Sequence, residues 1–408
     1  MKLKQIRVDG YKNLIDCEVN LGDFNVIVGP NNSGKSNLLE VMQLFPSILV
    51  ATLEEARTSK EAIERGLSFS KCHLKSHLNR PLKIGVSFEM EIQQKNWLVD
   101  YEVVVRFSEK WEFEFLKESL KAKEPSKRGP IKKYIERTGT KLKVVGKSHP
   151  ISKHNSSLWA IKVFYPHSKA LPNELVNFML AVMLLGFTKI YAISPDGMRN
   201  AVDKEVESLV LSRRTTSFDP LLVIDEIKEK TKYYSLFKET LCDILDLEDL
   251  NFEAKDIGSP SKTQKGAKKK RLRRFMIKRQ GSDYADLEEF SDGTFVVVAI
   301  LSSVFSSKYT NSILCIEELE NCLHPAAIEK LLHFLQDNAD KWPVLITTHS
   351  PYVLNGVKPE DVNVAVVDET GATHFEKIKN NRELRDYLNK GLMSFGDLLV
   401  DNYKRFRE

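Results

Sequence analysis

The segment Gly29–Ser36, with the sequence GPNNSGKS, decides the fold. It follows a short apolar run, Phe24–Val28, that predicts a buried strand, and it precedes Asn37–Met42, whose spacing suits a helix. A glycine loop of the pattern G-x-x-x-x-G-K-[ST] between a strand and a helix is typical of phosphate binding, because its backbone N–H groups surround an anion at the helix N-terminus. The sequence therefore predicts a nucleotide-binding α/β domain.

The polar residues of this loop have predicted roles that follow from the mechanics of the motif. The backbone N–H groups from Asn32 to Lys35 would surround the β-phosphate, the Lys35 ammonium would reach the β- and γ-phosphates, and the Ser36 hydroxyl would bind Mg²⁺. The predicted contacts with ATP are Gly29, Asn31, Asn32, Ser33, Gly34, Lys35, Ser36 and Asn37. A chance match in a structural turn is the alternative.

Two adjacent carboxylates end a second apolar run. Residues 312–316 have a strand-like pattern and are followed by Glu317 and Glu318. Because side chains alternate along a strand, one carboxylate would face the metal ion and the other the attacking water, as phosphoryl transfer requires. We assign Glu317 to Mg²⁺ and Glu318 to the water. The alternative is an acidic helix start, because carboxylates also favour a helix N-terminus.

A histidine ends a third run of this kind. Val344–Thr347 predicts a core strand, and His349 follows it, where a neutral imidazole is able to hydrogen-bond a γ-phosphate. A lone histidine is more often a packed or capping residue. Three strand-end polar groups in the order that phosphoryl transfer needs are harder to attribute to packing. We therefore predict Lys35, Glu318 and His349 as the catalytic residues.

Together with Phe290–Thr294 (FSDGT), these segments resemble ATPase heads of the ABC type, in the class that contains RecF, Rad50/SMC and OLD-like proteins. Residues 317–325, EELENCLHP, are similar to the Walker B motif and D-loop of that family, and His349 falls on its switch histidine. The resemblance covers residues 1–45 and 285–400, and the middle of the chain in outline. It implies an α/β fold, an ABC-type P-loop ATPase head with an antiparallel β-meander and a helical, basic lid insertion.

The same resemblance implies a homodimer closed around ATP. Ser291, Asp292 and Gly293 correspond to the signature loop, which in this family binds the γ-phosphate of ATP held by a second protomer. A hydroxyl and an N–H group at the start of a helix suit an anion, although Ser291-Asp292 alone would be an ordinary N-cap. The chain departs from the family by having Glu317 where Asp is usual. Its signature is Ser-Asp-Gly-Thr, where transporters have Ser-Gly-Gly.

By motif order, the 408 residues divide into three segments. Residues 1–80 form an N-terminal ATPase lobe with the Walker A loop, and residues 81–280 hold the β-meander and a helical insertion with basic loops. Residues 281–408 form a C-terminal lobe with the signature, Walker B motif and switch histidine. Gln93 and Gln94 are the candidates, by position, for the Q-loop of the family.

Positive charge is concentrated in two runs. Residues 117–147 hold eleven Lys or Arg against three acids, and residues 262–279 hold ten and no acid, whereas the whole chain carries only +5. We interpret both runs as loops between strands that present a surface for DNA or RNA through phosphate contacts. Solvated loops without a function are the alternative.

Composition and resemblance together predict the function. With 42% hydrophobic residues and no apolar stretch near ~20 residues, a folded, cytoplasmic protein without membrane contact is expected. We expect an ATPase whose ATP-bound dimer switches a DNA-related or anti-phage defence complex. The 59 residues after His349 are too few for a TOPRIM-type nuclease domain as in OLD proteins, so a nuclease or other effector would act in trans. A clamp that holds ATP and a protein partner without hydrolysis is the alternative, and the motor of a membrane importer is disfavoured.

Overall fold

The computed structural model describes residues 1–49, 80–107, 113–126, 129–165, 171–185, 189–192, 220–257, 270–305, 313–321, 323–341, 343–378, 384 and 394–402. The chain forms two compact units that interleave along the sequence. The first comprises residues 1–191, 311–317 and 338–408, and the second comprises residues 192–310 and 318–337. These units cut across the three segments drawn by motif order, because strands from both ends of the chain enter the first unit. Within the described ranges, no helix has the length and apolar character needed to cross a membrane.

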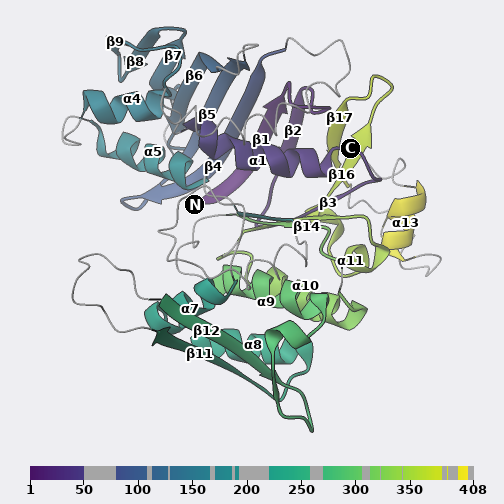
Figure 1. Cartoon of the computed structure of the whole chain (residues 1–408). Coiled ribbons are helices and arrows are strands. Elements are labelled where there is room, and N and C mark those ends of the chain that lie inside the picture. Colours follow the sequence, from purple (N-terminus) through teal and green to yellow (C-terminus); the bar gives the residue numbers. More distant parts are fainter. Residues whose placement is uncertain are drawn as a thin grey trace, which may run out of the picture. The chain divides into compact units, whose positions relative to one another are not determined.

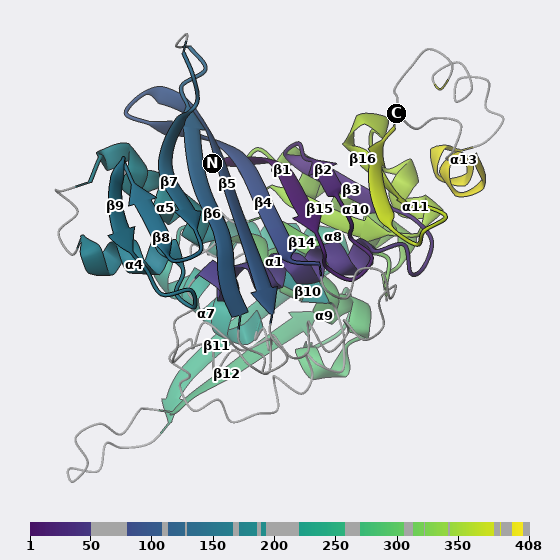
Figure 2. The ribbon, with the colours of Figure 1, turned by 90° about the horizontal axis from the view of Figure 1, so that it is seen from above.

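An antiparallel sheet of eight strands forms one layer of the first unit, in the order β2-β1-β4-β5-β6-β7-β8-β9. Its strands are β1 (Lys2–Asp9), β2 (Cys17–Asn20), β4 (Leu82–Ile92), β5 (Lys95–Phe107), β6 (Phe113–Lys123), β7 (Lys132–Thr138), β8 (Lys141–Val144) and β9 (Lys147–Pro150). One face of this sheet packs against α1 (Lys35–Leu49), α4 (Ser157–Phe164) and α5 (Asn173–Leu185), as Figures 1 and 2 show. The antiparallel meander that the resemblance implies thus has one face buried under helices.

A second sheet of six strands lies in the same unit, in the order β10-β14-β15-β3-β16-β17. Its strands are β3 (Phe24–Val28), β10 (Lys189–Ala192), β14 (Leu314–Glu317), β15 (Val344–Thr348), β16 (Val362–Val367) and β17 (Thr373–Lys377). Strands β14, β15, β3 and β16 run parallel, and β17 is antiparallel to β16. All five residues of β3 and of β15 are buried, as expected for parallel strands covered on both faces. The unit also contains α11 (Pro351–Asn355), η6 (Pro359–Asp361) and α13 (Phe395–Asn402).

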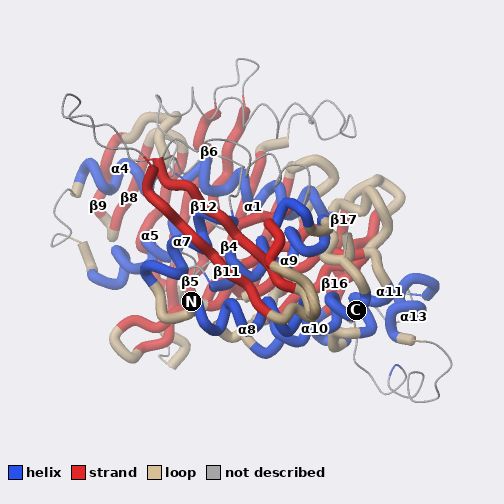
Figure 3. The backbone as a smooth tube through the Cα atoms, turned by 60° about the horizontal axis from the view of Figure 1, so that its bottom comes forward, coloured by secondary structure: helices blue, strands red, loops and turns tan. Residues whose placement is uncertain are grey.

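The second unit is a small helical layer on a three-stranded sheet. Its elements are α7 (Pro220–Lys230), α8 (Tyr234–Leu245), β11 (Asp249–Ile257), β12 (Lys270–Lys278), β13 (Tyr284–Asp286), η4 (Leu287–Glu289), α9 (Asp292–Phe305) and α10 (Pro325–Asp337). Helices α7 and α8 lie against one face of the sheet and also contact α9 (Figure 3). Residues 293–305 of α9 are all buried, which confirms the helix that its apolar sequence predicts.

One sequence expectation is wrong in detail. Residues 117–147 are not a loop, because they form most of β6, then β7, β8 and the start of β9 in the eight-stranded sheet.

Two successive helices, α7 and α8, lie between residues 220 and 245. Thr231 ends the first, since its Oγ1 donates to the Ile227 carbonyl (2.8 Å) and accepts from the Tyr233 N–H (3.1 Å).

A buried ion pair ties the meander to α4. Glu118 on β6 and Arg137 on β7 are 1% and 3% exposed, with 3.7 Å between Arg137 Nη1 and Glu118 Oε2. Glu118 also accepts hydrogen bonds from the Tyr101 hydroxyl (2.7 Å) and the Ser157 N–H (2.8 Å) at the start of α4. Arg137 donates to the carbonyls of three further residues, Gly139, Ser152 and Asn155. The buried charges are therefore paired and hydrogen-bonded, as burial requires.

Replacing Arg137 by Met should lower the free energy of unfolding by about 3 kcal/mol, because it leaves the Glu118 carboxylate buried without its cation. Chemical denaturation of both proteins measures this loss. Arg106→Met is the matched control, since Arg106 lies on β5 of the same sheet with an exposed side chain, and it should change stability by about 0.5 kcal/mol or less. Equal stability of the two variants would contradict the pairing.

Candidate functional site

The glycine loop joins β3 to α1 in the first unit, as predicted. Strand β3 ends at Val28, the loop follows, and α1 begins at Lys35. The backbone has left-handed conformation at Asn32 (φ 64°) and Gly34 (φ 89°), which allows the loop to turn sharply. Its tip, Pro30 to Asn32, is exposed, whereas Ser33, Gly34 and Lys35 are buried. This is the strand, loop and helix arrangement in which backbone N–H groups converge on a phosphate.

The Lys35 side chain folds back over its own loop. Its ammonium donates to the carbonyl oxygens of Gly29 (2.7 Å) and Pro30 (2.9 Å), and the residue is 5% exposed. These carbonyls hold the cation at the mouth of the loop. A phosphate there would offer the same ammonium charged acceptors, which form stronger hydrogen bonds than neutral carbonyls.

Ser33 supplies a buried hydroxyl to the same loop. The residue is 1% exposed, and its Oγ has no hydrogen-bond partner among the residues that the structure describes. A buried polar atom without a partner is costly, so such an atom at a phosphate loop suits a ligand oxygen. The exposed Ser36 hydroxyl lies at the first turn of α1. The loop thus fits the phosphates of a nucleotide.

The β16–β17 hairpin, distant in sequence, contacts the glycine loop. The sequence analysis did not predict this contact. Thr373, at the start of β17, donates from Oγ1 to the Ser33 carbonyl (3.1 Å) and from its N–H to the Asn13 carbonyl (2.8 Å). Asn13 Oδ1 accepts from Asn37 Nδ2 of α1 (2.6 Å). A Cβ on Gly34 would lie 2.6 Å from Thr373 Oγ1, so only glycine fits between the loop and the hairpin. No local motif marks Thr373, which lies 340 residues from Ser33.

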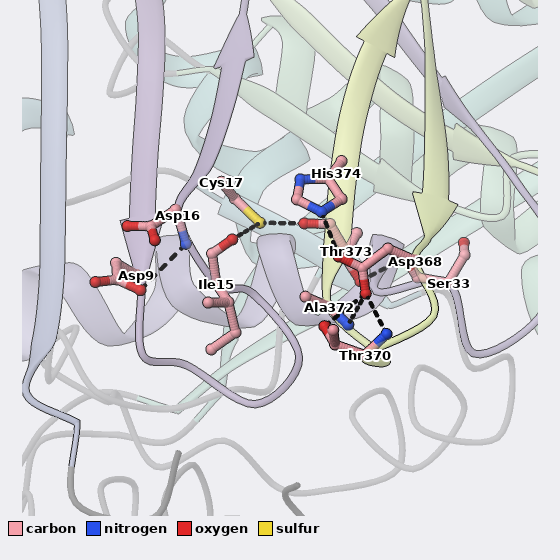
Figure 4. A network of polar contacts seen from close by, with 10 residues as sticks. All are labelled: Asp9, Ile15, Asp16, Cys17, Ser33, Asp368, Thr370, Ala372, Thr373 and His374. Atoms are coloured by element: carbon pink, nitrogen blue, oxygen red, sulfur yellow. Dashed lines mark hydrogen bonds and ion pairs between the residues drawn. The ribbon is translucent and has the colours of Figure 1, made fainter. Parts of the chain in front are cut away.

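Figure 4 shows how this hairpin is itself held in place. Asp368 accepts from the N–H and hydroxyl of Thr370 (2.8 and 2.6 Å) and interacts with His374 Nε2 (2.8 Å). The hydrogen bonds from Thr370 and His374 lower the pKa of Asp368, so its carboxylate stays ionised. On the other side, burial raises the pKa of Cys17 to about 12, and the neutral thiol donates to the Thr373 carbonyl. Thr373 is therefore fixed from both sides.

Substituting Thr373 by Val should weaken nucleotide binding about fivefold, the effect of one neutral hydrogen bond, while the fold is retained. Isothermal titration with ATP measures the affinity, and thermal unfolding checks the fold. Thr138→Val, on an exposed position of β7, is the control and should bind as the unmodified chain does. Equal ATP affinity in both variants would show that Thr373 does not contribute to nucleotide binding.

Parallel pairing brings two further predicted residues to the edge of the sheet that carries the loop. Ile316 of β14 pairs with Ile346 of β15, and Thr348 of β15 pairs with Val28 of β3. Glu317 is the last residue of β14, and His349 follows β15 directly. Glu317 is half-buried, and His349 is exposed. The first unit thus gathers Lys35, Glu317 and His349 at the carboxyl ends of three adjacent parallel strands.

The remaining predicted residues belong to the second unit. Glu318 has left-handed backbone (φ 49°) and accepts through Oε2 from Asn321 Nδ2 (2.8 Å). Ser291 is exposed and begins α9, because its carbonyl accepts the Thr294 N–H (2.9 Å). Asp292 and Gly293 are the first two residues of α9. The signature segment is therefore a helix N-terminus, as its sequence indicates.

The β12–β13 hairpin leads into this N-terminus and uses much of the second basic run. Arg274 forms a two-fold ion pair with Asp286 (2.6 and 2.8 Å), and Asp286 caps η4 with Glu289. The guanidinium of Arg279 lies 4.9 Å from the ring centre of Phe290, the residue before the signature. These cations hold the segment that precedes Ser291.

Gln93 and Gln94 lie in the two-residue turn between β4 and β5. The opposite end of β4 is the one near the loop region, since Pro81 contacts Gly10. The two glutamines are therefore far from the glycine loop, and the Q-loop assignment by position is wrong. Residues 262–269 of the second basic run lie outside the described residues.

Comparisons with known proteins bear on the family and the fold of the chain. A family described as "AAA ATPase domain" matches residues 1–181, and a family described as "AAA domain, putative AbiEii toxin, Type IV TA system" matches residues 225–355. No curated protein matches the sequence.

Three solved structures of SMC heads resemble the chain. The SMC head bound to the C-winged helix domain of ScpA has 11% identity and a TM-score of 0.51, and the match covers 92% of this chain and 97% of that one. The SMC head domain from Thermotoga maritima has 13% identity and a TM-score of 0.44, with coverage of 93% and 100%. The SMC head with an extended coiled coil, bound to the C-terminal domain of ScpA, is derived from Pyrococcus furiosus and has 11% identity and a TM-score of 0.47, with coverage of 96% and 99%.

At these identities the first of the three supports a statement about the fold alone. That fold is the mixed α/β architecture with an antiparallel sheet expected from the sequence. The two family matches, each over less than half of the chain, are to models described as AAA ATPase or AAA domains. The chain thus has the fold of an SMC-type ATPase head, and two of its segments are similar to AAA ATPase domains.

Proposed function

We propose that the chain binds and hydrolyses ATP and that ATP binding closes a homodimer. The observation that carries the proposal is the meeting of Lys35, Glu317 and His349 at three adjacent strand ends. Beside them is a loop whose buried Ser33 hydroxyl has no hydrogen-bond partner among the described residues. Phosphoryl transfer needs a phosphate cradle, an acidic metal ligand and a group near the γ-phosphate, and this edge has a residue for each. Steady-state release of phosphate from ATP, compared between the unmodified chain and Lys35→Ala, tests the proposal.

In this proposal each residue has a distinct role. The N–H groups of the loop hold the β-phosphate, and Lys35 exchanges its bonds to the Gly29 and Pro30 carbonyls for bonds to the β- and γ-phosphates. Glu318 takes the proton of the attacking water, and His349 hydrogen-bonds the γ-phosphate. The roles of Glu318 and His349 rest on the family resemblance together with their positions after β14 and β15.

The donor chemistry of the site fits Mg²⁺. This ion prefers oxygen ligands, and it is usually held by one or two carboxylates together with nucleotide phosphates. The Ser36 hydroxyl and the Glu317 carboxylate are such oxygens. When bound, Mg²⁺ would neutralise part of the phosphate charge. Glu317 is one methylene longer than Asp and would reach the ion from the end of β14.

The homodimer is proposed from the signature segment. Ser291, Asp292 and Gly293 of one protomer would bind the γ-phosphate of ATP on the other, because the helix N-terminus of α9 carries N–H groups suited to an anion. ATP would then favour the closed dimer by binding it more tightly than the open state.

The output of this switch would be read by a separate effector, such as a nuclease, in a DNA-related or anti-phage defence complex. The match to a family described with the AbiEii toxin and the SMC head solved with a domain of ScpA support a protein partner. Plating of phage on cells that express the unmodified chain or Lys35→Ala, each with its neighbouring genes, tests the defence role. Equal plating on both would exclude it.

A nucleic-acid contact is proposed on the outer side of the eight-stranded sheet. We call Lys117, Lys121, Lys133, Lys141 and Lys143 the basic face. Register places them on the side away from the buried residues, with Lys121 opposite Lys133 and Lys143 opposite Glu136. Acids also lie among them, including Glu136 and, opposite Lys121, Asp100 of β5. The pKa of Glu136 is lowered by a hydrogen bond from Lys133 and by the charges of Lys143 and Lys121.

The described part of the second basic run is less suited to this task. Arg273 pairs with Asp225 (2.8 Å), Arg274 with Asp286, and Lys278 with Glu248. Charges already paired within the chain have less to gain from phosphates. The basic face is therefore the better candidate of the two runs.

The double variant Lys141→Gln/Lys143→Gln should lower the salt dependence of duplex DNA binding. Each lysine that contacts a phosphate contributes about 1 to the slope of log K against log salt, so the slope should fall by about 2. Fluorescence anisotropy at several salt concentrations measures it. Lys341→Gln/Lys358→Gln removes two exposed lysines of the same unit elsewhere and should leave the slope unchanged. Identical slopes in both variants would exclude the basic face.

A further inference from the structure

A cavity of about 420 Å³ lies at the far end of the meander, in the first unit. It is lined by the β4–β5 turn, the end of β6, the start of β7 and the first turn of α5. Such a volume is in the range that holds a small organic ligand. The 11-residue strand β4 runs from Leu82, near the glycine-loop region, to Ile92 at this cavity, a span of roughly 35 Å. The cavity is therefore separate from the proposed ATP site.

The wall of the cavity has a net positive charge. Lys95 and Lys123 line it, and neither side chain has a partner among the described residues. Lys132 also lines it and is paired with Glu174 (3.5 Å), while its ammonium lies 4.4 Å from the ring centre of Tyr134. Lys132 thus compensates the carboxylate of Glu174. Two lysines remain to attract an anion.

The helix N-terminus adds polar donors to the same wall. Asn173 and Glu174 are the first residues of the 13-residue helix α5 and line the cavity. The first N–H groups of a helix have no acceptor within the helix and favour negative charge. A second carboxylate, Glu124, lies in the wall and accepts a hydrogen bond from the Ser126 hydroxyl (3.2 Å). The lining therefore carries three positive charges from lysines and two negative charges from glutamates.

Two aromatic rings lie in the apolar part of the wall, beside Ile92, Ala122 and Pro130. Trp97 and Tyr134 both pack edge-on against Phe178 of α5, with ring centres 5.4 and 5.3 Å apart. Because Phe178 is fully buried, it fixes the positions of both rings. The side-chain amides of Gln93 and Asn173, which can donate and accept, also line the cavity. A ligand that matches this wall carries an anion, a flat ring and polar groups on the ring edge.

We propose that this cavity binds a nucleotide unit, with its phosphate at Lys95, Lys123 and the α5 N-terminus and its base beside Trp97. Aromatic side chains stack bases of any sequence, and lysines bind the phosphate as point charges. The same unit can arrive as a free mononucleotide or as the phosphorylated end of a single strand. In either form, the site gives the chain a second nucleotide contact besides the proposed ATP site.

The test uses the full chain with Lys35→Ala, so that binding at the glycine loop does not mask the cavity. The probes are a fluorescent derivative of AMP, which lacks the β- and γ-phosphates, and a 5′-phosphorylated single-stranded oligonucleotide. Saturable binding of either probe is expected, and Lys95→Gln/Lys123→Gln should weaken it about tenfold or more, since two charged contacts are lost. Lys341→Gln/Lys358→Gln is the matched control and should bind as the parent does.

A second measurement tests the cavity without substituting its lysines. Acetylation of lysine side chains, read by mass spectrometry, should be slowed at Lys95 and Lys123 when AMP is present and unchanged at Lys358. Tight binding of AMP alone would identify a free nucleotide as the ligand, and binding of the oligonucleotide alone would identify a strand end. Absence of saturable binding for both probes, or equal affinity in the Lys95/Lys123 and control variants, would overturn the site. Because these assays do not use hydrolysis, their failure would leave the proposed ATPase function standing.

Discussion

Replacing Glu318 by Gln should lower the rate of ATP hydrolysis by about 10²- to 10⁴-fold, the usual contribution of a general base. Glutamine keeps the size and polarity of the side chain but does not accept the proton of the attacking water. ATP affinity should change little, because the loop and Lys35 are untouched. ATP-bound dimers should accumulate, since their exit by hydrolysis is blocked. Phosphate release gives the rate, and sedimentation velocity with ATP and Mg²⁺ gives the dimer fraction.

Glu320→Gln is the matched control, because it removes a carboxylate two residues further along the same turn. It should hydrolyse ATP at close to the parental rate. If Glu318→Gln hydrolyses ATP as fast as Glu320→Gln, Glu318 is not the base. If the unmodified chain forms ATP-dependent dimers without releasing phosphate, the chain is a clamp rather than an ATPase.

Lys35→Ala should reduce the affinity for ATP about 100-fold or more, because hydrogen bonds from one ammonium to two charged phosphates are lost and each contributes about 1.5–3 kcal/mol. Hydrolysis and dimer formation should fall with it, since both need bound ATP. Isothermal titration measures the affinity. The Gly29 and Pro30 carbonyls that Lys35 contacts lie beside exposed loop residues and can turn to water, so the fold should be retained.

Lys358→Ala controls for the loss of a lysine, because Lys358 is exposed and lies in the same unit. It should bind ATP with parental affinity. A Lys35→Ala chain that binds ATP as tightly as Lys358→Ala, with matching thermal unfolding, would show that the glycine loop does not hold the phosphates.

Local patterns were sufficient to predict the strands and loops that form the proposed ATP site. The apolar runs before Gly29, Glu317 and His349 are short, buried and bounded by polar residues, so they could be recognised singly. Their order in the chain then indicated that their ends meet. Parallel pairing of β14, β15 and β3 produces this meeting, because parallel strands end at one edge.

The contact of Thr373 with the glycine loop could not be predicted in this way. It depends on a parallel bridge between Leu14 and Thr373, which are far apart in sequence. The Cys17 thiol and the Asp368 turn that fix Thr373 are also non-local or lie in loops. The apolar–polar periodicity of a sequence does not indicate which loops contact each other in the fold.

Strands β6 and β7 were missed for a different reason. Glu118 and Arg137 occupy inner positions that alternation normally gives to apolar residues, so the apolar-polar pattern is interrupted there. The lysines of the basic face then dominate the composition, and the segment has the appearance of a charged loop. The inner charges are tolerated because they pair with each other and with backbone groups.

A crystal structure of the chain with Mg²⁺ and a non-hydrolysable ATP analogue tests the central claim most directly. We expect the Lys35 ammonium to lie about 2.7–2.9 Å from oxygens of the β- and γ-phosphates. The Ser36 hydroxyl and the Glu317 carboxylate should both bind the ion, and His349 should face the γ-phosphate. A nucleotide bound elsewhere, with Lys35 still on the Gly29 and Pro30 carbonyls, would contradict the account.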